Sequence, residues 1–271
     1  MSQAWRVLAQ NYAKFDTPLR PNTETLEAVR GLLTGEDPLV VVLGGTPIFA
    51  ELARRVWFVD VAGEALNLVA PTTQQLTIRK NWLDAADEFA RADLIVGDAS
   101  INAVDSTEAA ERLLRLLATT LRPGATLALR VFVKHELPAD VLRDRLTSAF
   151  ARGRFSEVRL LVYGVVAGAD GLTPVAEVDR YIANLGAHLG LDRDTSGTYR
   201  AAYFAWRGMS VETATAITTK AFFPSRTQIE TMFAAAGLRV STVPAGTFPL
   251  AECTPIYAAS GTHTTRRLLP A

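Results

Sequence analysis

Cysteine, histidine and net charge are all scarce in this sequence of 271 residues. Its one cysteine, Cys253, can form no disulfide within the chain, so a reducing compartment such as the cytoplasm is expected. Three histidines lie far apart, without the spacing of metal ligands, and no metal is expected: His135, His188 and His263. The 28 lysines and arginines balance 28 aspartates and glutamates, so the chain lacks the basic excess that nucleic-acid binding requires.

Long apolar runs are lacking as well. No stretch reaches the roughly 18 apolar residues that a membrane span needs, so no membrane partner is expected. The N-terminal stretch has neither the basic start nor the apolar core of a signal peptide. Hydrophobic residues nevertheless make up 49% of the chain, which is enough for a sizeable core. We predict a single domain over residues 1–271, and the oligomeric state stays open.

One short segment combines a buried strand with a glycine turn. Residues 39–43 are five consecutive aliphatic residues, the pattern of a strand buried on both faces of a parallel sheet. Gly44 and Gly45 follow, and then Thr46 and Pro47. Threonine is a favoured helix N-cap, and proline is favoured at the first helical position. The segment therefore predicts a strand, a tight turn and a helix.

Strand and helix patterns alternate along the rest of the chain. Further strands are predicted at 56–60, 74–80, 92–100, 125–133, 238–245 and 254–260. Helices are predicted at 63–70, 108–121 and 225–237. Capping boxes pair Asp105 with Glu108 and Ser225 with Gln228, and Gly237 ends the last helix. This alternation predicts an α/β fold with a doubly wound, Rossmann-like parallel sheet.

The rhythm changes between residues 138 and 224, where helices predicted at 138–152 and 174–190 are joined by turns rich in glycine and aspartate. We interpret residues 138–224 as a helical lid insertion and residues 1–34 as an N-terminal helical cap, both covering the carboxyl edge of the sheet. Aromatic residues of the insertion either wall a pocket for a cation or fill the core of the lid: Tyr163, Tyr181, Tyr199, Tyr203, Phe204 and Trp206.

The glycine turn and a lone aspartate together suggest a nucleoside ligand. In open parallel sheets, ligands bind beyond the carboxyl ends of the strands. Gly44 and Gly45 lack a Cβ and would let a ligand approach the backbone, and the following helix would present free N–H groups there. Asp60 ends the next strand, sixteen residues after Gly44, where a carboxylate can accept hydrogen bonds from ribose hydroxyls.

Two missing motifs narrow the choice of ligand. The turn lacks the full G-x-G-x-x-G pattern, which disfavours a dinucleotide, and no GK[ST] follows, which disfavours a P-loop triphosphate. Asp98 and the polar residues after it follow the fourth strand, where an adenine and a reacting group could be held.

At these residues the chain resembles the class I S-adenosylmethionine (SAM)-dependent methyltransferases. The resemblance covers roughly residues 18–132 and 225–260. It is carried, in order, by VVVLGGTP, VWFVD, ADLIVGDASINAV, LRPGATLALRVF and IETMFAAAGLRVSTV. The stretch PLRPNTETLEAV also looks like a bacterial subgroup that carries PLRP before a threonine–proline version of the glycine motif.

The resemblance implies a seven-stranded sheet whose last strand is antiparallel, with SAM as cosubstrate. It brings Gly44, Gly45 and Thr46 to the methionine part of SAM. It implies ribose contacts from Asp60 and the adjacent Val61, and adenine contacts from Asn81 and Trp82. It brings three residues near the adenine or the sulfonium: Asp98, Ala99 and Ser100.

The chain also departs from the family motif. Val42 stands where the family has an acidic residue two positions before its first glycine. Thr46 and Ile48 stand where the family has further glycines. The acidic residue commonly helps to hold the methionyl amino group, so this amine would be held differently here.

The resemblance implies an enzyme that transfers a methyl group from SAM to a small molecule by in-line displacement. Positioning and desolvation would then supply most of the catalysis. A base would deprotonate the nucleophile, either Asp98 or a lid tyrosine, Tyr163 or Tyr181. Arg130 and Phe132, at the end of the fifth strand, would lie near the acceptor.

Two alternatives stay open. Some proteins of this fold turn the amine of SAM on its own γ-carbon and release methylthioadenosine, as azetidine-2-carboxylate synthases do. The other is a non-catalytic, degenerate methyltransferase fold that binds a partner.

The N-terminal segment offers two further candidate groups. Trp5, Tyr12 and Phe15 are spaced like one face of a helix, which either docks the segment or faces the ligand. Arg20, between the prolines of PLRP, either clamps a carboxylate or forms a surface salt bridge.

Overall fold

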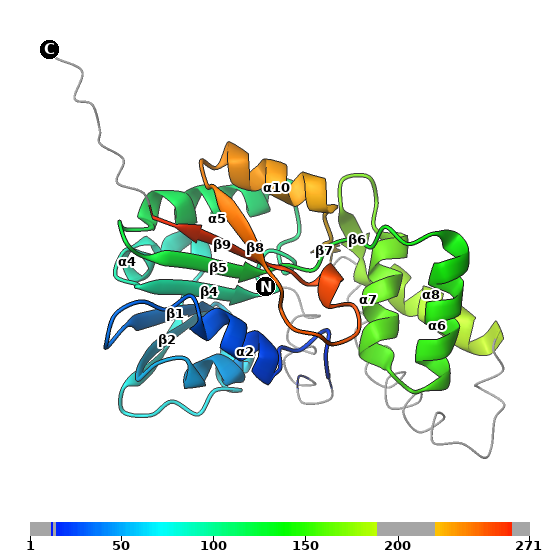
Figure 1. The fold of residues 1–271 in the computed structure, drawn as a ribbon, viewed down its shortest axis with the longest axis horizontal. Coiled ribbons are helices and arrows are strands. Elements are labelled where there is room, and N and C mark those ends of the chain that lie inside the picture. The colour runs from blue at the N-terminus through cyan, green and yellow to red at the C-terminus, as the bar shows by residue number, and fades with distance from the viewer. Residues whose placement is uncertain (1–11, 13–14, 189–219, 262–271) are drawn as a thin grey trace, which may run out of the picture.

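The computed structural model describes residue 12 and residues 15–188 and 220–261, and its centre is a seven-stranded sheet (Figure 1). The strand order is β3-β2-β1-β4-β5-β9-β8. The strands are β1 (Leu39–Leu43), β2 (Arg55–Asp60), β3 (Gln75–Arg79), β4 (Leu94–Asp98), β5 (Thr126–Arg130), β8 (Val240–Val243) and β9 (Ile256–Ser260). β9 runs antiparallel to both of its neighbours, and the other pairs are parallel. This confirms the predicted Rossmann-like α/β fold with an antiparallel last strand.

Helices cover both faces of the sheet (Figure 1). One face carries α2 (Thr23–Arg30), the 3₁₀ helix η2 (Pro47–Glu51) and α3 (Gly63–Leu66). The other carries η3 (Trp82–Asp84), α4 (Ala86–Phe89), α5 (Thr107–Thr120) and α10 (Arg226–Ala235). The sheet is therefore the middle layer of three.

Strand β1 explains why both faces are covered. All five of its side chains are buried, as the unbroken aliphatic run predicts. Leu39, Val41 and Leu43 pack on the side of α5, whereas Val40 and Val42 pack on the side of α2. Val42 therefore points into a sheet-to-helix core.

A second, smaller core belongs to the insertion, whose helices stand beside the sheet (Figure 1). Its helices are α6 (Ala139–Ala151), α7 (Phe155–Val166) and α8 (Val175–His188). A two-stranded antiparallel sheet joins them, made of β6 (Leu172–Pro174) and β7 (Lys220–Phe222). The sequence predicted α6 and α8. It did not predict α7 or the small sheet, because the apolar run of α7 is buried on nearly all sides and shows little helical periodicity.

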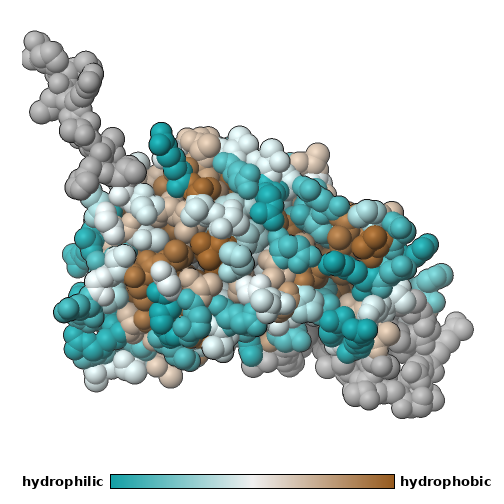
Figure 2. All heavy atoms as spheres, viewed as in Figure 1, coloured by the Kyte–Doolittle hydropathy of each residue, from teal (hydrophilic) through white to brown (hydrophobic). Residues whose placement is uncertain are grey.

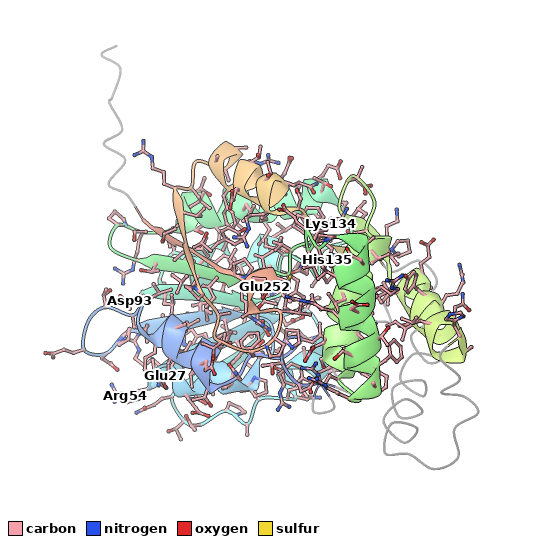
Figure 3. The ribbon with its side chains drawn as sticks, turned by 45° about the vertical axis from the view of Figure 1, so that its right-hand side comes forward. Glu27, Arg54, Asp93, Lys134, His135 and Glu252 are labelled. Atoms are coloured by element: carbon pink, nitrogen blue, oxygen red, sulfur yellow. The ribbon has the colours of Figure 1, made fainter. Side chains whose placement is uncertain are left out.

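Polar contacts tie the insertion to the sheet (Figure 3). Lys134 donates to the carbonyl of Gly168 at 2.7 Å, and the His135 ring lies 3.1 Å from the carbonyl of Leu161 in α7. Arg145 of α6 pairs at 3.1 Å with Glu252 of the 3₁₀ helix η4 (Ala251–Cys253), which precedes β9. The insertion is thus held both at the segment that follows β5 and at η4.

Several predicted helices are shorter than expected. The helix after the glycine turn is a five-residue 3₁₀ helix, because β2 begins at Arg55, and Thr46 caps it without a side-chain hydrogen bond. Ser106, not Asp105, is the N-cap of α5, since its hydroxyl accepts from the N–H of Ala109. Ser225 caps α10 as predicted, accepting from the N–H of Gln228.

Some predicted residues lie outside the described part of the chain. They are Trp5 in the predicted N-terminal cap, and Tyr199, Tyr203, Phe204 and Trp206 in the predicted lid. Within residues 1–34, the chain is helical in α2.

On the face seen in Figure 2, apolar residues lie in small patches separated by polar ones. In the described part of the chain, the exposed large hydrophobic side chains do not cluster in one element. They are Val61, Leu76, Val141, Val165 and Tyr181. Scattered exposure of this kind is normal for a protein surface.

Gly45 is where the turn after β1 meets α3. A Cβ added to Gly45 would overlap the backbone carbonyl of Ala65, whereas a Cβ on Gly63 would meet nothing within 4 Å. We expect Gly45→Ala to lower the free energy of unfolding by roughly 1–3 kcal/mol or more, because neither backbone can yield easily. Gly63→Ala is the control and should leave that free energy unchanged or slightly raised. Equal urea midpoints for the two variants would contradict this account of the turn.

Candidate functional site

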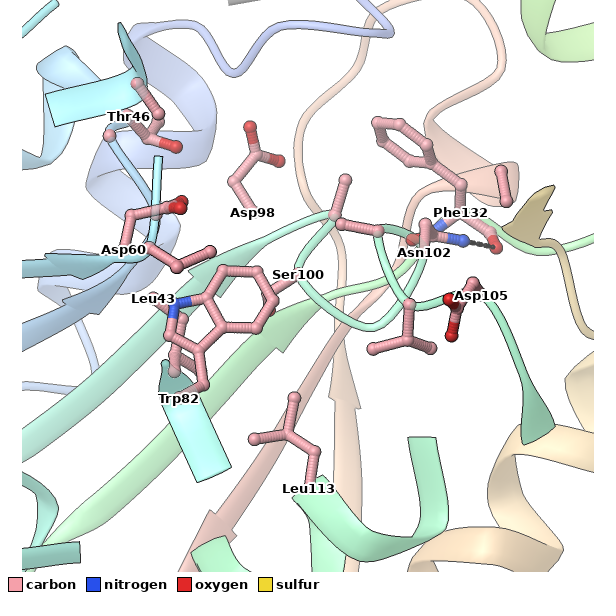
Figure 4. Close-up of a pocket in the computed structure, with 18 of the residues that line it drawn as sticks. Leu43, Thr46, Asp60, Trp82, Asp98, Ser100, Asn102, Asp105, Leu113 and Phe132 are labelled. Atoms are coloured by element: carbon pink, nitrogen blue, oxygen red, sulfur yellow. Dashed lines mark hydrogen bonds between the residues drawn. The ribbon is translucent and has the colours of Figure 1, made fainter. Parts of the chain in front are cut away.

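A cavity of about 720 Å³ opens at the carboxyl ends of β1, β2, β4 and β5 (Figure 4). A volume of this size is typical of cofactor and small-molecule sites. Its lining includes all ten residues predicted to bind the cofactor: Gly44, Gly45, Thr46, Asp60, Val61, Asn81, Trp82, Asp98, Ala99 and Ser100. The structure therefore brings together residues that are far apart in the sequence.

The glycine turn forms one end of this cavity. Gly44 has a φ of +110°, a conformation that favours glycine, and its N–H donates to the carbonyl of Val59 at 2.9 Å. A Cβ on Gly44 would lie 3.7 Å from Oδ2 of Asp60. The turn and the carboxylate that ends β2 are therefore immediate neighbours. Gly45 is needed for the close approach to Ala65, so its small size serves the fold.

Asp60 is a buried carboxylate with few partners. Its side chain is only slightly exposed, and Oδ1 accepts from the N–H of Ala62 at 2.8 Å. Burial raises the pKa of Asp60 to about 6, against the opposing effect of that hydrogen bond. A carboxylate in such a place suits a ligand that donates hydrogen bonds, such as a pair of hydroxyl groups.

Trp82 supplies a flat wall beside this carboxylate. Its Nε1 donates to the carbonyl of Val59 at 2.7 Å, so the end of β2 fixes the orientation of the indole. Figure 4 shows the ring between Asp60 and Ser100. Asn81 lies next to it, and its side chain accepts from the N–H of Leu83 at the start of η3. A planar base could stack on this wall while its sugar reaches Asp60.

Asp98, at the end of β4, forms a buried ion pair with Arg130 at the end of β5. Nε of Arg130 donates to Oδ1 of Asp98 at 2.6 Å, and the two side chains are 1% and 5% exposed. Arg130 also donates to the carbonyl of Pro18 at 2.8 Å and more weakly to that of Leu19 at 3.5 Å. Asp98 lines the cavity, whereas Arg130 lies behind it.

The turn after β4 is shaped by two residues that follow Asp98. Ala99 has a φ of +53°, unusual for a residue with a Cβ, and its N–H donates to the carbonyl of Arg130 at 3.0 Å. Ser100 is buried, and among the described residues its hydroxyl has no hydrogen-bond partner. An unpartnered buried hydroxyl that lines a cavity is available to a ligand.

The other end of the cavity is aromatic. Tyr163 of α7 stacks on Phe223, with ring centroids 4.2 Å apart, and Phe132 lies 5.9 Å from the same ring. Arg159 of α7 faces this end and pairs with Asp179 of α8 at 3.0 Å. Tyr12, Phe15 and Leu19 close the cavity from the N-terminal segment.

Asn102 holds the aromatic end in place. Its Nδ2 donates to the carbonyls of Phe132 and Phe222, at 2.8 Å and 2.7 Å, and its Oδ1 accepts from the N–H of Phe132 at 2.9 Å (Figure 4). The amide joins the segment that follows β5 to β7, so it serves to position both.

Two of the three predicted catalytic residues lie at the cavity. They are Asp98 and Tyr163, whereas Tyr181 is 38% exposed and is not among the lining residues. Arg20 stacks over the ring of Tyr12, with its Cζ 5.8 Å from the centroid.

Arg159 and Phe223 were not predicted from the sequence, and Asn102 was included only within the polar stretch that follows Asp98. A signal for Arg159 was present, since it is an isolated charge within the apolar run of α7.

Other reactive groups lie apart from this site. Cys253 is buried outside the cavity lining, and burial raises the pKa of its thiol to about 12. Among the residues that the structure describes, no cluster of histidine, cysteine or acidic side chains has the makings of a metal site. Nor does any helix in those segments have the length and apolar character to cross a membrane.

Asp60 gives this site a measurable pH dependence. The pKa of about 6 in the folded protein exceeds the usual value of about 3.9. Its contribution to stability is therefore fully present below about pH 4 and lost as pH rises through 6. An asparagine does not ionise, so Asp60→Asn lacks this loss of stability. We therefore expect the unfolding free energy of the variant minus that of the wild type to be roughly 1–3 kcal/mol larger at pH 7 than at pH 4.

Urea unfolding at several pH values measures this difference. Asp105→Asn, at the exposed edge of the same cavity, is the matched control, because it removes a carboxylate that is exposed rather than buried. A constant difference for Asp60→Asn would contradict the burial of its charge.

No protein-family model matches the sequence, and no curated protein matches it. Among solved structures, a candidate Zn-dependent alcohol dehydrogenase of Rhodobacter sphaeroides has a TM-score of 0.56 at 12% identity, over 96% of this chain and 97% of that one. A chain from the complex of the Haloferax volcanii Trm112 methyltransferase activator with a candidate methyltransferase has a TM-score of 0.52 at 11% identity, over 96% and 95%. Human N-acetylserotonin methyltransferase with SAM has a TM-score of 0.45 at 13% identity. The match covers 89% of this chain but only 51% of that one, so this chain spans about half of its length. The first two likenesses show a shared fold, which is the Rossmann-like α/β fold described above.

Proposed function

We propose that the protein is an enzyme that binds SAM in this cavity and transfers its methyl group to a small molecule. The observation that carries the proposal is that Gly44, Asp60 and Trp82 converge on one end of the cavity, beside an aromatic second end. The first end suits an adenosine: hydroxyl groups of the ribose reach Asp60, and the base stacks on Trp82. The buried hydroxyl of Ser100 offers one further contact near the base.

The aromatic end suits the reaction and its acceptor. Aromatic faces attract a cation such as a sulfonium. Phe132, Tyr163 and Phe223 also form an apolar wall, which fits a flat, mainly apolar acceptor of small size. In the described residues the exposed large hydrophobic side chains come from different elements, and the charge of the sequence is balanced, which favours a small acceptor over a macromolecular one.

The methyl transfer itself requires little acid catalysis by the protein. The acceptor atom forms a bond to the methyl carbon while the carbon–sulfur bond breaks, and the electron pair stays on sulfur as a neutral thioether. The protein would align the two atoms and exclude water. Tyr163, which lines the aromatic end, is the candidate base: as a phenolate it would take the acceptor's proton, and Nη2 of Arg159, 3.4 Å from its oxygen, would donate to the negative charge.

A second candidate function uses SAM without an acceptor. The amine of SAM would attack its own γ-carbon, the bond from that carbon to sulfur would break, and methylthioadenosine would leave with the electron pair. The amine would lose a proton. Val42 favours this reading, because its buried aliphatic side chain leaves β1 without a carboxylate for the amine. Mass spectrometry after incubation with SAM alone separates the two: methylthioadenosine supports cyclisation, and turnover only with an added acceptor supports methyl transfer.

Binding of SAM is the first test of the proposal. We expect calorimetry to detect SAM binding to the wild type, and Asp60→Ala to weaken it roughly 10-fold or more, because a carboxylate that accepts hydrogen bonds is lost. Asp105→Ala removes an exposed carboxylate from the edge of the same cavity and should bind SAM like the wild type. A wild type that binds neither SAM nor S-adenosylhomocysteine would instead favour a non-catalytic binding protein.

A further inference from the structure

The charges that line the cavity are few and unevenly placed. Among the described residues of the lining, acidic or basic side chains belong to Asp60, Asp98, Asp105 and Arg159. Arg159 is compensated by Asp179, and Asp105 is exposed. Asp60 stands at the ribose end. Asp98 is therefore the buried carboxylate nearest the middle of the cavity, and Figure 4 shows it between Asp60 and Phe132.

Asp98 is held on one side only. Oδ1 accepts from Arg130, and no other hydrogen bond or ion pair to this carboxylate exists in the described part of the chain. The other two nitrogens of Arg130 donate away from Asp98, to the carbonyls of Pro18 and Leu19. Its guanidinium also lies 5.0 Å from the centroid of the Phe132 ring. The arrangement fixes one carboxylate oxygen and leaves the second for a ligand.

A ligand with a cation fits this free oxygen best. SAM carries two positive groups, the sulfonium and the α-ammonium of its methionyl part. The ammonium has N–H donors that a carboxylate can accept, whereas a sulfonium with its apolar substituents is served by aromatic faces. The rings of Phe132, Tyr163 and Phe223 can serve the sulfonium, which leaves Asp98 for the ammonium. Strand β1 offers no carboxylate, since Val42 points into the core.

We infer that the Asp98 carboxylate, oriented by Arg130, binds the α-ammonium of the methionyl part of SAM. This inference rests on the proposed function and assigns Asp98 to ligand binding. Arg130 is a positioning residue: it touches no ligand, and it holds the carboxylate in place. It also docks the backbone of residues 18–19, whose neighbours Phe15 and Tyr12 close the cavity.

Three ligands can distinguish binding of the ammonium by Asp98 from a general effect of Asp98 on the cavity. SAM has both cations, S-adenosylhomocysteine has only the ammonium, and methylthioadenosine has neither. We expect Asp98→Asn to weaken SAM and S-adenosylhomocysteine roughly 10- to 100-fold, the effect of a lost hydrogen bond to a charged group, and to leave methylthioadenosine within about 3-fold. Asp60→Asn should weaken all three, because all three carry the ribose. Calorimetry with the full chain gives these affinities.

Each other outcome has a definite meaning. Equal loss of all three ligands in Asp98→Asn, or no loss, overturns the inference while the proposed function stands. Loss of SAM alone would assign Asp98 to the sulfonium and also overturn it. A wild type that binds none of the three overturns both proposals. Binding of methylthioadenosine by Asp98→Asn reports that the variant is folded.

The role of Arg130 has its own readout, the pH dependence of SAM affinity. Among the residues that the structure describes, the titratable or charged groups that face Asp98 are Arg130 from β5 and Tyr12 from the N-terminal segment, with Arg20 beyond the Tyr12 ring. Burial raises the pKa of Asp98, and Arg130 opposes that effect. Without Arg130 the pKa of Asp98 rises further. As pH falls, we therefore expect Arg130→Met to lose SAM affinity at a higher pH than the wild type does, and raising the pH should restore the affinity.

Arg130→Lys is the matched control, because it keeps the positive charge. Its SAM affinity should keep the pH dependence of the wild type because the positive charge remains, even though one ammonium cannot reproduce the three donor contacts of the guanidinium. The affinity for methylthioadenosine, which lacks the ammonium, should not shift with pH differently in the two variants. An Arg130→Met profile identical to that of the wild type would remove Arg130 from this role.

Discussion

The buried ion pair between Asp98 and Arg130 joins three parts of the molecule that the chain leaves far apart. Asp98 ends β4, Arg130 ends the neighbouring β5, and the same guanidinium binds the backbone that leads into α2. Taking two charges out of water is unfavourable unless geometry and further hydrogen bonds compensate. Here each partner is oriented by the sheet register, which makes Asp98 and Arg130 direct neighbours. The pair therefore fixes how the cavity is closed as well as what its centre presents.

The cavity has two chemically different ends, and the fold explains the division. One end is built from the carboxyl ends of β1 and β2, which supply a glycine turn, a buried carboxylate and an anchored indole. The other end is built where the insertion returns to the sheet, through Asn102, Phe132 and Phe223. A ligand with a polar nucleoside and a cationic, partly apolar tail matches both ends, with Asp98 between them.

Much of this could be predicted from local patterns. The aliphatic run of β1, the glycine turn and the aspartate that ends β2 are local in sequence, and they specify the β1–β2 pair and the end of the cavity that contains Asp60. Helix lengths were predicted less well. The expected helix after Thr46 is a five-residue 3₁₀ helix, because the next strand starts too soon for a longer one. The sequence makes Tyr163 and Tyr181 equal candidates for a lid base, yet the two project from different helices. Tyr181 is exposed and does not line the cavity.

The α/β alternation, the buried parallel strands and the positions of Gly44, Asp60 and Asp98 at strand ends can be read from local patterns, because each depends on hydrophobic periodicity and turn chemistry within a few residues. Three other features depend on the packing of distant segments: Arg130 faces Asp98, Arg159 reaches the cavity, and Asn102 binds both Phe132 and Phe222. Those contacts join residues 20 to 120 positions apart. Such pairings follow from strand register and from the packing of the insertion, and no local pattern encodes either.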